Sequence, residues 1–404
     1  INMGGGLMQL VAYGAQDIYL TGNPQITFFK VVYRRHTNFS MEAIQQTWDG
    51  TEDGLTNAQC TTTIARQGDL IHRMYLEIAG RPFETRQNFT AASIIDVILE
   101  IGGQQIDKQS GQWMNIWSHL TEPNPSAHVG TVEYNKSDGT NFQNMSGMGG
   151  VRGDSSSNNT TFWVPLQFWF CRNPGLALPL IALQYHEVII KLSHTFSNGF
   201  DAVTSNKLWC DYIYLDTDER RRFAQVSHEY LIEQVQENSL STASAGTTVS
   251  DKLNFNHPVK ELIWMKDSVA DGILAAAATG TATYKLLLNG HDRFSARDFR
   301  YFTRTLVWQH HTGCGGMDAA MASDTWHTNK SVNGALNDSI AVYSFALKPE
   351  EHQPSGTCNF SRIDDARIIS VADASSTTTT TKIYAVNYNV LRIMSGMGGL
   401  AYSN

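Results

Sequence analysis

The chain has 404 residues, of which 42% are hydrophobic and 10% aromatic, so it can bury a sizeable core and is not an intrinsically disordered protein. Because a single hydrophobic core stops growing near about 250–300 residues, this length predicts two domains of roughly 200 residues each. Thirty Lys and Arg residues against 38 Asp and Glu give a formal charge of −8, which argues against a broad nucleic-acid-binding face.

The N-terminal segment, residues 1–23, joins Gly4-Gly5-Gly6 to the short apolar run 7–11. This composition predicts an arm that becomes ordered against another surface rather than a domain of its own. We expect no signal peptide and no membrane span. The five cysteines are far apart and form no CxxC pair, so we interpret them as reduced thiols of a protein assembled in the cytosol.

The first predicted domain covers residues 24–215. Apolar and polar residues alternate in short segments such as 95–101, each ended by a turn such as Gly102-Gly103. A period of two with a turn every ~8–12 residues is typical of an antiparallel sandwich or barrel. Residues 112–120 predict a short helix at a sheet edge, and no other stretch predicts a helix as clearly. The Gly-, Ser-, Asn- and Thr-rich stretch 123–161 predicts a long surface loop.

An apolar and aromatic run at 162–170 is followed by a turn at Pro174-Gly175 and by the strand-like residues 185–192. The run is too short to cross a bilayer, which needs roughly 20 apolar residues, and it predicts buried strands. A charged connector, 216–227, then leads to the second predicted domain, 228–404. Within that domain the tracts 275–280 and 375–381 predict exposed loops.

The two predicted domains share landmarks that recur in one order, displaced by about 180–190 residues, which indicates an internal duplication. The paired landmarks are 44–46 with 235–237, 67–68 with 257–258, 99–106 with 286–293, and Gly175 with Gly356. Two unrelated all-β domains in tandem would show similar punctuation, and that alternative stays open from the residues alone. Two sandwiches of this size favour jelly rolls.

No arrangement in the sequence predicts catalysis or cofactor binding. His310-His311 is the densest histidine pair, but neighbours in a strand point to opposite faces and would not hold one metal ion. The acids and bases of 216–222 predict a capped helical turn. The pentapeptide Ser-Gly-Met-Gly-Gly occurs at 146–150 and at 395–399, yet it lacks the spacing of a phosphate-binding loop. We therefore expect no enzyme activity, no cofactor and no metal.

Several Asn-X-Ser/Thr tripeptides are candidate glycan attachment sites. The best placed, in segments predicted to be loops, are Asn135, Asn144, Asn158, Asn159, Asn329 and Asn337.

Blocks of sequence from end to end of the chain closely resemble the major capsid proteins of large icosahedral double-stranded DNA viruses, most closely the phycodnavirus (chlorella-virus-like) branch. These blocks are residues 6–39, 99–108, 173–188, 211–225, 228–236, 253–260, 353–364 and 384–402. The chain departs from the family pattern within the loops, around 123–161, 270–283 and 309–337.

The resemblance implies an all-β tandem double jelly roll, with two eight-stranded antiparallel sandwiches and minor helices in loops. It implies a homotrimeric, pseudo-hexagonal capsomer that contacts neighbouring capsomers, and minor capsid proteins beneath the shell. It further implies a location in the virion capsid after assembly in the host cytoplasm, near an internal viral membrane but without insertion into it and without direct nucleic acid contact. Long loops would form outward towers that are glycosylated in algal-virus relatives.

The residues leave open three alternatives to a principal capsid subunit. These are a minor capsid paralogue, a glycan-binding jelly-roll attachment protein and a metal-dependent jelly-roll enzyme. Glycan-array binding would favour the second, and stoichiometric metal would be needed for the third.

Overall fold

The computed structural model describes residues 5–12, 14–83, 88–123, 140–150, 160–268, 273–274, 282–318, 335–336, 338–372 and 380–402. The chain divides into two compact units, Ile1–Asn38 and Phe39–Asn404. The first unit contains two short helices, α1 (Gly5–Val11) and α2 (Ile18–Thr21), followed by chain without regular structure. This unit extends beyond the predicted arm 1–23. Its described large apolar side chains are exposed, from Leu7 to Tyr33.

The second unit begins with two sheets that form the first module. One sheet has the order β1-β10-β4-β7, with the short strand β8 also paired to β4. The other has the order β2-β3-β9-β5-β6. The strands are β1 (Phe39–Gln46), β2 (Asp49–Gly50), β3 (Ala58–Thr63), β4 (Leu70–Pro82), β5 (Ile94–Ile101), β6 (Gln104–Ser110), β7 (Thr160–Pro165), β8 (Leu178–Pro179), β9 (Val188–His194) and β10 (Phe200–Leu215).

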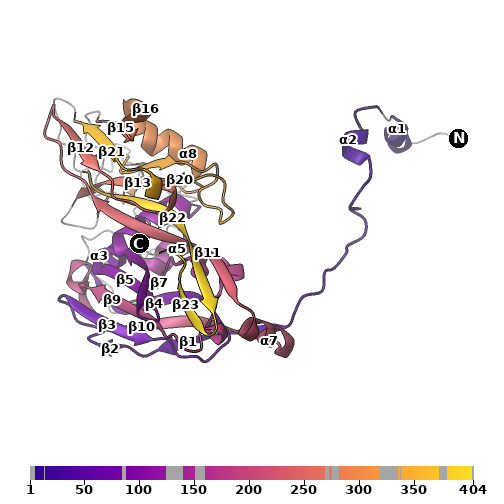
Figure 1. Ribbon diagram of the computed structural model, residues 1–404, viewed down its shortest axis with the longest axis horizontal. Helices are drawn as coiled ribbons and strands as arrows, with labels where there is room; N and C mark the ends of the chain where they lie inside the picture. Colours follow the sequence, from indigo (N-terminus) through magenta and orange to yellow (C-terminus); the bar gives the residue numbers. More distant parts are fainter. Residues whose placement is uncertain are drawn as a thin grey trace, which may run out of the picture. The chain divides into compact units, whose positions relative to one another are not determined.

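Two further sheets form the second module. One has the order β11-β22-β13, with β19 and β20 paired to β13 and β23 paired to β22; the other has the order β12-β21-β15-β16. The strands are β11 (His228–Ser239), β12 (Thr248–Lys252), β13 (Pro258–Ser268), β15 (Thr283–Leu288), β16 (His291–Asp298), β19 (Ile340–Ser344), β20 (Cys358–Asn359), β21 (Ala366–Val371), β22 (Thr380–Met394) and β23 (Met397–Leu400). Short pairs are made by β14 (Ile273–Leu274) with β13 and by β17 (Met317–Asp318) with β18 (Ala335–Leu336). In Figure 1 the first module runs from indigo to magenta and the second from pink to yellow.

The two modules have the same strand order, which confirms the predicted tandem double jelly roll. If the eight long strands of each are numbered in chain order, one sheet reads first, eighth, third, sixth and the other reads second, seventh, fourth, fifth. The four sequence landmarks fall at equivalent places. For example, Gly102-Gly103 joins the fourth and fifth strands of the first module, and Asn289-Gly290 does so in the second. All four residues have positive φ, as a tight hairpin turn requires.

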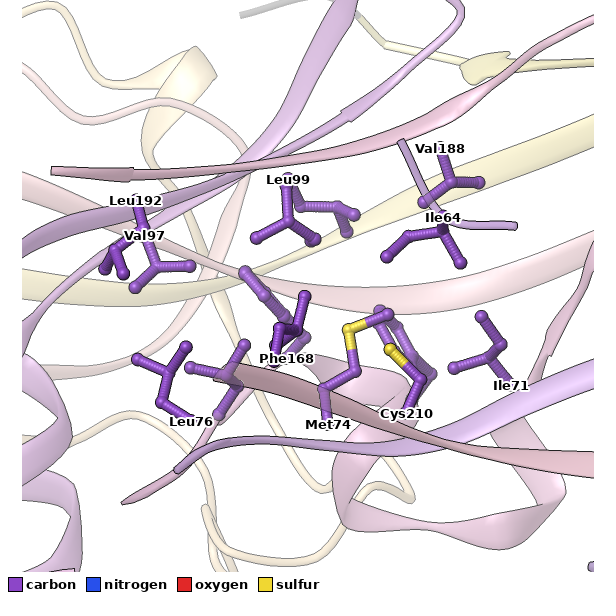
Figure 2. Packing of buried hydrophobic residues seen from close by; sticks show 14 of the residues in the cluster. Ile64, Ile71, Met74, Leu76, Val97, Leu99, Phe168, Val188, Leu192 and Cys210 are labelled. Carbon is purple, nitrogen blue, oxygen red and sulfur yellow. The ribbon is translucent and has the colours of Figure 1, made fainter. Parts of the chain in front are cut away.

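Each module has its own hydrophobic core between its sheets. In the first, alternate residues of β4 and β5 point inward because successive side chains of a strand face opposite sides. Figure 2 shows Leu76 and Met74 on one layer facing Val97 and Leu99 on the other. In the second module the core is centred on Trp264, whose ring centroid lies 5.1 Å from that of Phe302.

Helices occupy the connections. Besides α3 (Phe89–Ser93) they are α4 (Gly111–Thr121), α5 (Asn141–Ser146), α6 (Trp169–Arg172), α7 (Thr217–Gln225), the π-helical turn Tyr301–Thr305 and α8 (Leu306–His310), with 3-10 turns at Pro174–Leu176, Leu180–Ala182, Phe196–Asn198 and Phe360–Arg362. The predicted helix 112–120 is confirmed as α4, and the predicted helical turn in the connector as α7. No helix among the described residues combines the length and apolarity needed to span a bilayer.

Three local expectations are wrong. The run 162–170 is a strand only to Pro165. Residues Trp169–Arg172 form helix α6, which packs against β4 and buries Trp169 and Phe170. Part of the predicted surface loop 123–161 is buried, because Gly147 (φ +65°) ends α5 and lets Met148 enter the first core. Residues 380–381 belong to β22, whereas 375–379 and 275–280 lie outside the described residues.

Candidate functional site

Helix α4 of the first module lies on the outer face of the second module's β11-β22-β13 sheet. Its apolar residues follow the helical spacing i, i+3, i+4, i+7, so one face is apolar. These residues, with the sheet residues they pack against, are Trp113, Ile116, Trp117, Leu120, Ile263, Met265, Ile340, Val342, Tyr384 and Val386, and the same cluster contains Val307 of α8. We call this contact, with the polar groups described below, the junction. It joins the two jelly rolls of one chain.

Local sequence positions α4 at the junction. The Ser110 side chain accepts a hydrogen bond from the backbone N–H of Trp113 at 3.1 Å and caps the helix. Gly111 is required because a Cβ atom there would lie 2.2 Å from the carbonyl oxygen of Ala91. The Trp113 ring then lies 5.3 Å from that of Tyr384 on β22.

A buried charge cluster lies beside α4 and is centred on Glu233 of β11. The Glu233 carboxylate is 2.9 Å from Nη1 of Arg172 and 2.8 Å from Nζ of Lys260, and His352 Nδ1 is 3.6 Å away. Burial opposes ionisation of Glu233, but the cations outweigh it, Lys260 most of all, and lower its pKa to about 2. Arg172 comes from the first module and Lys260 from the second, so the carboxylate holds the two together.

The charge cluster and the apolar face of α4 are in direct contact. The guanidinium carbon of Arg172 lies 4.3 Å from the centre of the Trp117 ring, which is a cation–π distance. Trp117 is only 4% exposed, so this contact is shielded from water.

His311, just after α8, links two carboxylates of the second module. Its Nε2 lies 3.0 Å from Glu261 Oε2, and its Nδ1 lies 3.0 Å from Glu350 Oε1. Burial favours the neutral ring, but the two carboxylates outweigh it and raise the pKa of His311 to about 9. The histidine is therefore a cation at neutral pH.

The expectation that His310-His311 lies in a strand is wrong. His310 is the last residue of α8, and only His311 turns inward. Both ring nitrogens of His311 are taken up by carboxylates, and no group of three or more His, Cys, Asp or Glu among the described residues could hold a metal ion.

Strands β6 and β11 provide a third junction contact. The backbone N–H of Val235 donates to Asp107 Oδ1 at 3.2 Å, and the Gln234 side chain donates to the carbonyl of Ile106. Burial raises the pKa of Asp107 to about 6, despite the hydrogen bonds that its carboxylate accepts from Val235, Gln109 and Lys108.

A cleft of about 380 Å³ opens next to the junction on the first module's outer sheet face. Its lining includes Arg73 and Tyr75 of β4, Pro165 of β7, Trp117 of α4 and Glu350 of the second module.

The candidate glycan sites are mostly outside the described residues: Asn135, Asn158, Asn159, Asn329 and Asn337 are in this group. Asn144 lies on α5, half-buried, and its Nδ2 donates to the carbonyl of Thr140 at 3.2 Å.

The repeated Ser-Gly-Met-Gly-Gly pentapeptide has two different conformations. At 146–150 it ends a helix and buries Met148 completely. At 395–399 it forms the turn between β22 and β23, with positive φ at Ser395 and Gly396, and Met397 is 52% exposed. Neither copy follows a strand and opens a helix as a phosphate-binding loop does.

The five cysteines carry no disulfide. Burial raises the pKa of both Cys60 and Cys171 to about 12, so these thiols stay protonated at neutral pH.

Sequence reasoning missed the junction charges. One signal was available, because Lys260 and Glu261 interrupt the apolar residues of a strand that is buried on both sides. A buried charge in such a position needs a partner.

Comparisons with known proteins cover nearly the whole chain. A family model described as major capsid protein N-terminus matches residues 27–216, and one described as large eukaryotic DNA virus major capsid protein matches residues 219–316 and 325–399. The major capsid protein of Pyramimonas orientalis virus is 51% identical over 419 residues, covering 100% of both chains. That of Paramecium bursaria Chlorella virus 1 is 41% identical over 476 residues, again covering 100% of both.

Solved structures give the same result. A chain of the PBCV-1 virus capsid matches with a TM-score of 0.76 and 36% identity, covering 94% of this chain and 100% of that one. The Faustovirus major capsid protein matches with a TM-score of 0.63 at 11% identity, covering 96% of each chain, which shows the shared fold.

Proposed function

The chain belongs to the family of large eukaryotic DNA virus major capsid proteins and is a structural subunit of a viral capsid, and on this premise we propose that three copies form a pseudo-hexagonal capsomer of an icosahedral shell. The observation that carries the proposal is the identical strand order of the two modules. One chain presents two similar modules side by side, so a ring of three chains presents six. A closed ring of this kind needs one heterologous contact repeated three times.

The trimer is tested by size-exclusion chromatography with light scattering on the purified protein. We expect a single species of three times the 44.9 kDa chain mass. A monodisperse monomer at micromolar concentration contradicts the proposal, and electron microscopy of the same sample should show hexagonal outlines.

The exposed apolar residues of Ile1–Asn38 support a role for this unit in binding partners. We propose that the arm 1–23 orders against minor capsid proteins beneath the shell, near an internal viral membrane. A truncated protein lacking the arm should still form trimers but lose binding to those proteins. Retained binding would contradict this part of the proposal.

We further propose that the two modules are residues 24–215 and 228–404, with 216–227 as the connector. The protein has no catalytic role, is assembled in the host cytoplasm, and contacts neither nucleic acid nor the membrane interior directly. Glycans on Asn135, Asn158, Asn159, Asn329 or Asn337 are tested by mass spectrometry of purified virions.

A further inference from the structure

Each module carries a helix at the same place, between its fifth and sixth long strands. In the first module this is α4, and in the second it is the helical run Tyr301–His310. The two sequences match where the helices end: Ile-Trp-Ser-His-Leu-Thr at 116–121 and Val-Trp-Gln-His-His-Thr at 307–312. The duplication therefore places Trp308 at the position of Trp117.

The two equivalent tryptophans differ completely in exposure. Trp117 is 4% exposed because it lies against the next module, whereas Trp308 is 81% exposed. A tryptophan on the surface of a helix is costly to leave in water, and this residue type is enriched at the centres of protein interfaces. Among the described residues, no other module covers Trp308 in the way that the second module covers Trp117.

The surface on which a second copy of this helix would fit is present on the first module. In the second module α4 covers the cross-strand row Tyr384, Ile263 and Val342. In the first module the equivalent strands are β10, β4 and β7. Their register pairs Trp209 with Tyr75 and Tyr75 with Pro165, and these three residues form the corresponding row. These residues are only partly buried, and Trp163, one row further along, is exposed.

The cleft described above lies at this row. Tyr75, Pro165 and the exposed Arg73 all line it. In the intrachain contact the Trp117 ring stacks against Arg172. Arg73 can offer the same cation–π contact to an incoming indole ring.

We propose that Trp308 of one copy inserts into the Arg73–Tyr75–Pro165 cleft of a second copy, and so repeats between chains the contact that Trp117 makes within a chain. This inference deepens the proposed trimer, on which it rests, by naming the contact that closes the ring. Each module would then place the tryptophan of its helix on the next module's outer sheet around all six positions.

The first test replaces Trp308 by alanine and measures the oligomeric state across a concentration series by light scattering. Because the side chain contacts little within its own chain, Trp308→Ala should fold normally, as checked by its unfolding midpoint. We expect the concentration at which half the trimer dissociates to rise at least about thirtyfold, as for an interface hot spot. Tyr185→Ala, which removes a similarly exposed aromatic elsewhere, is the matched control and should leave it unchanged.

The acceptor side is tested by Arg73→Glu and by a photo-crosslinking phenylalanine analogue in place of Trp308. We expect Arg73→Glu to weaken the trimer and the crosslinks to fall on peptides containing Arg73, Tyr75 or Pro165 of another chain. A native trimer that Trp308→Ala leaves intact, or crosslinks to other peptides, overturns this inference while the trimer itself stands. A native monomer overturns both.

Discussion

The Nζ atom of Lys260 lies 2.8 Å from Oε1 of Glu233, and both side chains are buried between the two jelly rolls. Lys260 is on the second module, and Glu233 also binds Arg172 of the first. The pair therefore forms part of the attachment between the modules. A buried ion pair is costly to desolvate, and removing one partner leaves an uncompensated charge.

Lys260→Met should therefore lower the free energy of unfolding by about 3 kcal/mol, at the low end of the range for broken buried pairs because Arg172 remains. Denaturation in urea measures this change. Lys348→Met is the matched control, since Lys348 forms an exposed pair with Glu351, and it should change stability by less than about 1 kcal/mol. Equal effects of the two substitutions would show that the buried pair has no special role.

The His311 bridge predicts a pH dependence. Its pKa is raised to about 9, so its contribution to stability is complete below its usual pKa of 6.5 and is lost as the pH rises through 9. His311→Gln should destabilise the protein by about 2–3 kcal/mol at pH 6, and the difference from the native protein should shrink by pH 9. Urea unfolding at pH 6, 7, 8 and 9 measures both proteins, and a constant difference would contradict the assigned charge. Glu350 does not contribute to the change in stability between pH 6.5 and pH 9. Its pKa is lowered, so its contribution to stability is lost only at acidic pH.

The Asp107 carboxyl predicts a trend on the acidic side. Its pKa is raised to about 6 by burial, so the native protein loses stability as the pH rises from 4 through 6. Asp107→Asn removes this titration. The free energy of unfolding of the variant, relative to that of the native protein, should therefore increase by about 1–2 kcal/mol between pH 4 and pH 7. Thermal unfolding across that range checks the sign, and a decrease would show that the hydrogen bonds of the carboxylate outweigh its burial.

The repeated pentapeptide offers a comparison of one substitution in two environments. Met148→Ala should cost about 2–5 kcal/mol, because Met148 is fully buried in the first core. Met397→Ala should cost less than about 0.5 kcal/mol, because that side chain is half exposed at the start of β23. Urea denaturation of both variants provides the measurement, and similar losses would contradict the burial of Met148.

Asn144 should carry no glycan in the folded protein, since its Nδ2 is bonded to the carbonyl of Thr140 within a half-buried helix. Mass spectrometry of the peptide containing Asn144 from virions should find only the unmodified mass. A hexose or N-acetylhexosamine increment at this residue would contradict the expectation.

The sequence by itself determined the elements and their duplication. Alternation along 95–101, the Gly102-Gly103 and Asn289-Gly290 turns, and the apolar face of 112–120 are local signals, and each leads directly to a strand, hairpin or helix. The jelly-roll prediction followed because the same signals recur in the same order in both halves.

Only the tertiary structure decided the environments of individual side chains. Trp117 and Trp308 have similar neighbours in sequence, yet one is buried and the other exposed, because within the described part of the chain only Trp117 lies against the other module. Glu233, Arg172 and Lys260 are 27 or more residues apart and come from three different elements, so no local pattern reveals their contact. Burial and charge pairing depend on which surfaces the folded chain brings together, and that information is not contained in any short stretch.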